Sequence, residues 1–169
     1  LSEFSPAQFE VNLHHVDDPV LACDHAVLLK RAVKAAAVRN GLGATFMAKP
    51  FEENSGNGLH VHVSLLDEAG DNVFAGESRD GPFSDRLRHA IGGLGALMAE
   101  SMAIFAPNAN SYRRHAPGSY VPATPTWGPN HRGVAMRIPV SGPANTRLEH
   151  RVAGADANPY LVVAAVLAG

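Results

Sequence analysis

Short segments in which apolar and polar residues alternate constrain the fold of this chain more than any other feature of its sequence. In LHVHVSLL at 59–66, the polar residues His60, His62 and Ser64 are separated by single apolar residues. Successive side chains of a β-strand point to opposite faces, so this segment predicts a strand with one apolar and one polar face. The same pattern is found in QFEVNL at 8–13, VAMRIPV at 134–140 and TRLEHRV at 146–152. Together these segments predict a sheet with one polar face.

Three further segments carry the signals of helices. The dipeptide DP at 18–19 is typical of a helix start and NG at 40–41 of a helix end, and the run between them is mainly apolar. This run predicts a helix of about five turns. Apolar residues also recur at helical spacing in the segment 84–105, and the segment 155–169 predicts a final helix.

The remaining segments are less regular. ATFMAKP at 44–50 predicts a short strand ended by proline, and a turn at 67–72 leads into a return strand that begins at Val73. The segment 107–132 holds five prolines and little periodicity, so we expect a long structured loop. Strands joined by turns and interrupted by long helices predict an α+β fold, with a mainly antiparallel sheet that helices cover on one face.

Composition argues against several kinds of partner. The 169 residues are 46% hydrophobic and 18% charged, with a formal net charge of −2. No broad basic surface is therefore expected to attract nucleic acid or an anionic membrane. The first residues lack a basic and apolar leader, and no stretch has the roughly 18 apolar residues of a membrane span. The single cysteine, Cys23, cannot form an internal disulfide and favours a cytoplasmic location.

The polar sides of the predicted strands carry carboxylates, imidazoles and arginines, with almost no lysine. Carboxylates with an imidazole suit Mg²⁺ or Mn²⁺, because these hard ions prefer oxygen ligands and accept a nitrogen. Arginines suit a polyphosphate, because the guanidinium group matches phosphate oxygens and keeps its charge. A nucleotide with bridging metal ions satisfies both sets, so this face predicts phosphoryl transfer. Its residues are Glu10, His60, His62, Ser64, Arg137, Arg147, Glu149 and Arg151.

A simpler interpretation of the same residues stays open. Each histidine taken alone is more often structural than a ligand, and each alternating strand can belong to a sheet with a hydrated face. The residues at 147–151 could form a row of exposed salt bridges, each worth about 0–1 kcal/mol. Serine or cysteine nucleophiles are not indicated, because the chain has no G-x-S-x-G motif and Cys23 lies among apolar residues of a predicted helix.

Six motifs, read in order, resemble successive motifs of the catalytic domain of the glutamine synthetase superfamily. They are ATFMAKPF, NSGNGLHVHVSL, NSYRRHAPGSYVP, NHRGVAMRIPV, TRLEHRVAGADANPYL and VLAG, and they extend over nearly all 169 residues. With PAQFEVNL and ANPYL, the chain is most similar to the branch that joins glutamate to amines other than ammonia, such as the γ-glutamyl-polyamine synthetases. The resemblance implies that the predicted α+β sheet is curved.

The resemblance also has implications for domain organisation. It implies that residues 1–169 are part of a single catalytic domain, and that the N-terminal domain and the start of the catalytic domain lie outside this chain. Such a piece is expected to be inactive alone. Active sites of the family form between subunits of large rings, so a homo-oligomer is expected for the full-length parent.

By the same resemblance, the parent enzyme uses ATP to phosphorylate the γ-carboxylate of glutamate, and an amine then displaces the phosphate. Two divalent ions, Mg²⁺ or Mn²⁺, assist. The implied metal ligands are Glu3 and Glu10 for one ion, and His60 and Glu149 for the other. The implied substrate-binding residues are Gly56, Arg114 and Arg132, the implied catalytic residues are Arg114, Arg132 and Arg151, and the implied ATP-binding residues are His62, Ser64, Arg137 and Arg147.

Three positions depart from the pattern of the ammonia-using enzymes. The spacing from Glu3 to Glu10 is one residue shorter, and Ser55 stands in place of an asparagine that contacts the substrate. Tyr120 stands where those enzymes have a glutamate that helps to deprotonate ammonium. A neutral phenol cannot hold an ammonium ion as a carboxylate does, so we expect either a different amine or an acceptor site at another position. Ligation of glutamate to a larger amine is the leading hypothesis. The alternatives are an ordinary ammonia-using glutamine synthetase and a catalytically silent nucleotide-binding homologue.

Overall fold

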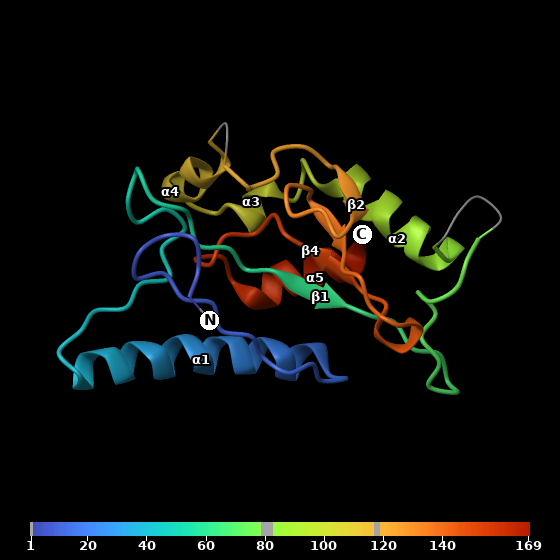
Figure 1. Cartoon of the computed structure of the whole chain (residues 1–169), viewed down its shortest axis with the longest axis horizontal. Helices are drawn as coiled ribbons and strands as arrows, with labels where there is room; N and C mark the ends of the chain where they lie inside the picture. The colour runs from blue at the N-terminus through green and yellow to red at the C-terminus, as the bar shows by residue number, and fades with distance from the viewer. Residues whose placement is uncertain (1, 79–82, 117–118) are drawn as a thin grey trace.

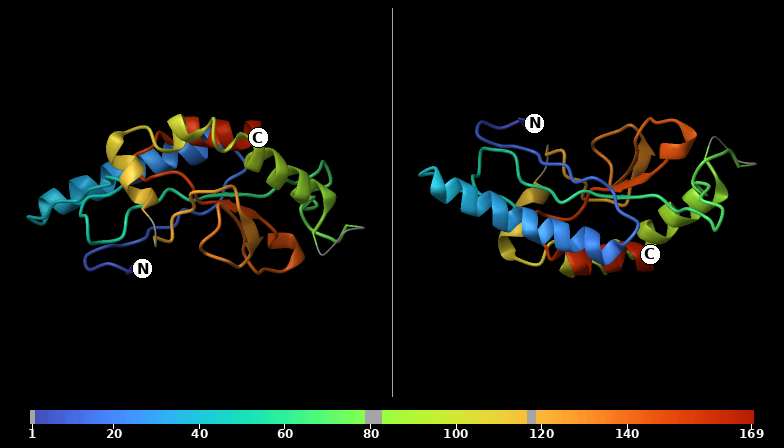
Figure 2. Two further views of the ribbon diagram at one scale, coloured as in Figure 1. Left: turned by 90° about the horizontal axis from the view of Figure 1, so that it is seen from above. Right: turned by 90° about the horizontal axis from the view of Figure 1, so that it is seen from below.

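The structure, a computed structural model, describes residues 2–78, 83–116 and 119–169. Helices and strands follow one another in the order shown in Figure 1. Both views of Figure 2 show the helices α1, α2 and α5 along one side of the molecule, with the orange strands on the other side. The elements are α1 (Pro19–Arg39), β1 (Val61–Val63), α2 (Asp85–Leu97), α3 (Met102–Phe105), α4 (Ala109–Tyr112), η1 (Arg113–His115), β2 (Trp127–Pro129), β3 (Met136–Ile138), η2 (Pro143–Asn145), β4 (Leu148–His150) and α5 (Pro159–Ala168).

The four strands form one sheet in the order β1-β4-β3-β2. Strand β4 pairs antiparallel with both β1 and β3, whereas β2 and β3 are parallel. The register aligns Glu149 of β4 with His62 of β1 and Arg137 of β3. The predicted α+β class and mainly antiparallel sheet are therefore confirmed, and the three alternating segments that form β1, β3 and β4 point their polar residues to one face.

Capping residues fix where the long helices begin. The side chain of Asp18 accepts hydrogen bonds from the backbone N–H groups of Val20 (2.8 Å) and Leu21 (3.1 Å), as an N-cap residue does. Ser84 caps α2 in the same way. The predicted helix over 84–105 is interrupted after α2 and resumes at α3. None of the helices in the described ranges combines the length and apolar character that a membrane span requires.

The apolar side of the sheet packs against the helices and forms one hydrophobic core. Phe105 and His150 pack together there, with ring centroids 4.6 Å apart. Burial lowers the pKa of His150 to about 4, so this core histidine is uncharged at neutral pH. The largest fully buried side chains are Phe105, Leu87, Met136, Leu148, His150, Val152, Val162 and Ser111.

Two of the predicted strands are wrong. In the segment 8–13, the only pairing among the described residues is an isolated bridge between Phe9 and Ser2, and the side chains of Phe9 and Val11 are 73% and 55% exposed. In the segment 44–50, Lys49 hydrogen-bonds through its backbone N–H and C=O to the side-chain amide of Asn110. Alternation alone does not make a strand, because a strand also needs a neighbour to satisfy its backbone.

Two other expectations are only partly confirmed. The turn at 67–72 forms, with Gly70 at a φ of +86°. Near this turn, the described residues show a bridge between Leu66 and Asn72 and a hydrogen bond from the N–H of Val73 to the C=O of Leu65, but no regular return strand. The described part of the predicted loop over 107–132 contains α4, η1 and β2. This stretch is more ordered than its prolines indicate.

The core position of Leu148 gives a test of the sheet. Leu148 lies in the central strand and is 1% exposed, so Leu148→Ala leaves a cavity between sheet and helices. We expect the free energy of unfolding to fall by about 2–5 kcal/mol, measured by urea denaturation followed by circular dichroism. In contrast, Leu42→Ala removes a side chain that is 67% exposed and is expected to change stability by less than about 0.5 kcal/mol. Equal effects of the two substitutions would contradict this description of the core.

Candidate functional site

Glu149 is the centre of the polar face. It lies in the middle of the central strand and is only 2% exposed. Arg137 donates a hydrogen bond of 2.7 Å from Nη1 to Glu149 Oε2, and Arg151 donates from Nη1 to Oε1. The imidazole of His60 lies on the same side, with Nδ1 at 3.3 Å from Oε1 of Glu149. A buried carboxylate is thus surrounded by two guanidinium groups and one imidazole.

The charges of this cluster follow from its surroundings. Burial raises the pKa of Glu149, but the charge of Arg151 and the hydrogen bond from Arg137 outweigh this effect and hold the pKa below its usual range. Burial, together with the charge of Arg151, lowers the pKa of His60 to about 3, although Glu149 opposes this shift. At neutral pH the cluster therefore presents a carboxylate and a neutral imidazole side by side.

Further predicted residues extend the polar face along β1 and β3. Arg147 donates from Nε to Nδ1 of His62 at 3.2 Å, and Arg137 donates from Nη2 to the side-chain oxygen of Asn130 at 2.7 Å. Ser64 is exposed and follows the end of β1. The pKa of His62 is lowered by burial and by Arg147, while Glu149 raises it. The structure thus places His62 and Arg137 on either side of Glu149, with Arg147 bound to His62. The sequence did not indicate Asn130.

Arg114 occupies a second buried position, in the short helix η1. It is 3% exposed, and its Nη1 donates to the backbone carbonyl of Val152 at 3.0 Å. Burial lowers the pKa of Arg114 to about 10, Asp156 opposes this shift and Arg151 adds to it, so the guanidinium group stays charged at neutral pH. Arg114 therefore lies against the segment that follows β4, in a site that water barely reaches.

The loop NSGNG at 54–58 encloses Arg114. A Cβ atom added to Gly56 would overlap Cγ of Arg114 and lie 2.7 Å from the carbonyl oxygen of Ala48. A Cβ atom added to Gly58 would lie 2.8 Å from Nε2 of His60 and 3.1 Å from Nη2 of Arg114. The lack of a side chain at both positions allows the loop to pack directly against the site, and the sequence indicated this only for Gly56.

The N-terminal segment lies against the same loop. Gln8 donates from Nε2 to the backbone oxygen of Gly56 at 3.0 Å and to the side-chain oxygen of Asn57 at 2.9 Å. Glu3 and Glu10 flank Gln8 in irregular backbone, where Glu3 is exposed and Glu10 is half-buried. Gln8, which lies between the two glutamates in the sequence, thus contacts the loop. The assignment of Glu3 and Glu10 to a metal ion stays a prediction.

Arg132 is not joined to the cluster around Glu149 by any hydrogen bond or ion pair between described residues. It is exposed in the turn that precedes β3. Its role in substrate binding stays a prediction, and so does that of Tyr120, whose side chain is 72% exposed. Neither position belongs to the cluster around Glu149 or to the enclosure of Arg114.

The cluster fits one half of a divalent metal site. Glu149 supplies carboxylate oxygens and His60 a neutral nitrogen, a pair of ligands that Mg²⁺ and Mn²⁺ accept. Among the described residues, no three His, Cys, Asp or Glu side chains lie close enough together to hold a metal ion. Further ligands would therefore have to come from the bound substrate, from water or from other parts of the protein.

The arginines of the site fit an oxyanion. The Nε atoms of Arg114, Arg137 and Arg151 are buried and have no hydrogen-bond partner among the described residues. A buried N–H group without a partner is costly, by roughly 1–3 kcal/mol, so these donors favour a bound acceptor. Phosphate or carboxylate oxygens are the acceptors that guanidinium groups match best.

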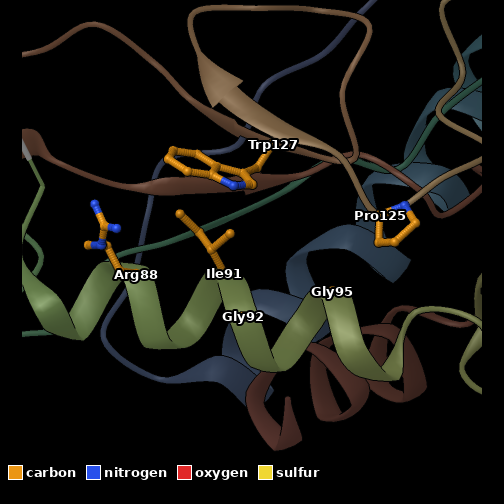
Figure 3. Close-up of a pocket in the computed structure, with 6 residues that line it drawn as sticks. All are labelled: Arg88, Ile91, Gly92, Gly95, Pro125 and Trp127. Atoms are coloured by element: carbon orange, nitrogen blue, oxygen red, sulfur yellow. The ribbon is translucent and has the colours of Figure 1, made fainter. Parts of the chain in front are cut away.

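A cavity of about 330 Å³ lies apart from this face, on the helix side of the sheet. Figure 3 shows the ring of Trp127 above Ile91 of α2, with Arg88 at one end and Pro125 at the other. Trp127 pairs with Met136, a residue of the apolar side, so the cavity belongs to the interface between helix α2 and the sheet. It has no part in the polar cluster.

The close approach of Gly56 to Arg114 gives a direct test. Gly56→Ala introduces a methyl group into space that Arg114 and the Ala48 carbonyl already fill, so we expect a loss of about 1–3 kcal/mol in the free energy of unfolding. Gly43→Ala is the matched control, because a Cβ atom there meets nothing within 4 Å. If urea denaturation gave equal midpoints for Gly56→Ala and the unmodified protein, the described enclosure of Arg114 would be wrong.

Comparison with known proteins shows the family of this chain. The profile of the glutamine synthetase catalytic domain matches residues 1–169. The chain is 51% identical to the gamma-glutamylputrescine synthetase PuuA of Escherichia coli K12, over 100% of this chain and 35% of that protein. It is 43% identical to a glutamate–isopropylamine ligase of Pseudomonas sp., over 98% of this chain and 36% of that protein.

A solved structure gives the same result. The chain superimposes on "Apo GmaS without ligand" with a TM-score of 0.77 and 39% identity, over 89% of this chain and 34% of that one. The chain thus spans about a third of the length of the curated relatives it matches. Because the domain profile covers every residue and the fold agrees, the chain belongs to the glutamine synthetase family and lies within its catalytic domain.

Proposed function

We propose that the complete protein carrying this chain is an ATP-dependent and metal-dependent ligase that joins the γ-carboxylate of glutamate to an amine larger than ammonia. The observation that carries the proposal is the buried Glu149, held by Arg137 and Arg151 beside the neutral His60. The names of the two relatives above, one for putrescine and one for isopropylamine, support the choice of an amine substrate.

In this proposal, the cluster around Glu149 binds the nucleotide phosphates. His60 and Glu149 hold one divalent ion, Mg²⁺ or Mn²⁺, which neutralises phosphate charge when it is bound. Arg137 and Arg147 supply guanidinium groups along the same edge, next to His62. Ser64, at the exposed end of β1, adds a hydroxyl group beside the nucleotide.

The enclosure of Arg114 binds glutamate. A charged, almost dry guanidinium group attracts a carboxylate more strongly than an exposed one does. Gly56 allows the substrate and the loop to approach Arg114 without a side chain between them. We assign Arg132 and Arg151 to the charge that develops on the transferred phosphoryl group, and Glu3 and Glu10 to the second ion.

The amine determines which γ-glutamyl amide is formed. After transfer of phosphate from ATP to glutamate, the amine nitrogen attacks the γ-carbonyl carbon, and phosphate leaves with the electron pair of the broken C–O bond. Tyr120 offers a neutral phenol, with no negative charge to hold ammonium, and this supports a larger amine. An ammonia-using glutamine synthetase and a silent nucleotide-binding homologue are the two alternatives.

The proposal concerns the complete protein. The relatives are about three times as long as this chain, so the remaining ligands and the amine site are expected in other parts of the sequence. We infer that 1–169 is one part of a single catalytic domain and that the isolated piece does not turn over. A homo-oligomer in the cytoplasm, without nucleic acid or membrane partners, completes the proposal.

The activity is testable with the purified complete protein, ATP, glutamate, Mg²⁺ or Mn²⁺ and a panel of amines. We expect phosphate release that depends on both glutamate and amine, together with a γ-glutamyl amide detected by mass spectrometry. Faster turnover with ammonia than with every amine tested would support an ordinary glutamine synthetase. A catalytically silent homologue would bind the nucleotide and form no γ-glutamyl amide.

The role of Glu149 is tested by Glu149→Gln, which keeps the shape of the side chain and removes the negative charge. We expect kcat/KM to fall by about 100-fold, with a larger requirement for metal ion, because a charged ligand is lost. Glu68→Gln is the control, since Glu68 is exposed in the turn that follows β1 and has no assigned role in the site. Full activity of Glu149→Gln would contradict the proposed metal site.

A further inference from the structure

Asp156 is a charged residue of this region for which the proposed reaction has no role so far. It lies in the segment between β4 and α5, and its Oδ2 atom accepts a hydrogen bond of 2.6 Å from the hydroxyl of Ser111 and one of 3.0 Å from the amide of Asn108. Its Oδ1 atom is buried and has no hydrogen-bond partner among the described residues. One oxygen of the carboxylate thus accepts two hydrogen bonds, and the other is buried without one among the described residues.

The first oxygen ties Asp156 to the element that carries Arg114. Ser111 belongs to α4, and α4 continues directly into η1, where Arg114 is three residues further along the chain. Ser111 is 1% exposed, so its bond to Asp156 is shielded from water. This contact holds the helical turn before Arg114 against the segment that follows the central strand.

The second oxygen lies close to Gly154, as the guanidinium group of Arg114 does. A Cβ atom added to Gly154 would lie 2.5 Å from Oδ1 of Asp156 and 3.7 Å from Nη1 of Arg114. The carboxylate and the guanidinium group are therefore neighbours of the same glycine. The charge of Asp156 also counteracts the lowering of the pKa of Arg114 by burial.

Helix α1 also binds the segment that contains Asp156. Lys30 donates from Nζ to the backbone oxygen of Ala155 at 2.6 Å and to that of Ala157 at 3.4 Å. The carbonyl groups on both sides of Asp156 are thus bound to a long helix. Asp156 is fixed by its neighbours, so its carboxylate can in turn fix the groups that it contacts.

Resting on the proposed function, we propose that Asp156 is a positioning residue that orients Arg114 for glutamate through Ser111 and through its carboxylate beside Gly154. The other arginines of the site have a different counter-charge, because Arg137 and Arg151 both bind Glu149. Loss of Asp156 is therefore expected to affect glutamate binding and to leave nucleotide binding unchanged.

A purely structural role predicts a different pattern. If Asp156 only joined α4 to the segment before α5, its loss would lower stability and impair glutamate and ATP binding alike. The separation of the KM for glutamate from the KM for ATP therefore distinguishes the two roles. A second distinction comes from comparing a variant that removes the charge of Asp156 with one that keeps this charge and removes only a hydrogen bond to it.

The kinetic test uses the complete protein with ATP, glutamate and its best amine. Asp156→Asn removes the charge and is expected to raise the KM for glutamate about tenfold, with the KM for ATP within twofold of the unmodified protein. Ser111→Ala keeps the charge but loses the hydroxyl, so a smaller rise is expected. The control is Asp67→Asn, which removes a turn carboxylate that accepts backbone N–H bonds from Ala69 and Asp71 and should change neither constant.

An unchanged KM for glutamate in Asp156→Asn, or an equal rise in both constants, would overturn the proposal. If Asp156→Asn does not fold, Ser111→Ala and Asn108→Ala test the proposal instead. Each removes one hydrogen bond to Asp156 and keeps the carboxylate. A selective rise in the KM for glutamate in both supports the positioning role. No rise in either contradicts it.

A double-mutant cycle measures the coupling between Asp156 and Arg114 from thermal stability and does not depend on catalysis. It can therefore fail or succeed independently of the proposed ligase function. Absence of turnover by the unmodified protein would refute the ligase and leave the cycle valid. We expect Asp156→Asn to lower the Tm less when Arg114→Met is already present than when Arg114 is intact. Additive Tm shifts would show that the two residues act independently and would contradict the inference.

Discussion

The structure depends on keeping one carboxylate, Glu149, charged in a place that water barely reaches. A buried anion is stable only when it is paired and hydrogen-bonded, and here Arg137 and Arg151 satisfy both oxygens. The register of the sheet meets this requirement, since it places Arg137 of β3 opposite Glu149. It also explains the division of the molecule seen in Figure 2, since the other face of the same strands is free to bury apolar residues under the helices.

A second constraint brings distant segments to Arg114. The glycine loop at 54–58, the N-terminal segment around Gln8 and the segment after β4 all meet near this guanidinium group, although they lie far apart in the sequence. The side chain of Gln8 binds the N-terminal segment to the loop. Backbone hydrogen bonds around the bridge between Gly58 and Gly154 join the loop to the segment after β4. The two buried sites adjoin through Arg151 and His60, which fits a reaction in which phosphate passes from a nucleotide on one side to a carboxylate on the other.

The sequence predicted the regular parts of this arrangement well, and the irregular parts poorly. Strands β1, β3 and β4 and the helix α1 follow from alternation and from an N-cap at Asp18, because these signals are local. The segments 8–13 and 44–50 have strand-like patterns but remain irregular, because alternation does not reveal whether a partner strand exists. Six polar residues of the predicted face make contacts in two groups: His60, Arg137 and Arg151 gather around Glu149, and Arg147 binds His62. Asn130, Gly58 and Asp156 were missed, since their roles arise from long-range contacts that no periodic pattern encodes.

The central claim is that Glu149 and His60 bind a divalent ion that holds nucleotide phosphates. Calorimetric titration of the complete protein with a non-hydrolysable ATP analogue, with and without Mg²⁺ or Mn²⁺, tests this most directly. The account predicts tight binding that requires the ion in the unmodified protein, and weaker binding that needs a higher concentration of the ion in Glu149→Gln. Equal affinity of the unmodified protein for the analogue with and without metal ion would contradict it.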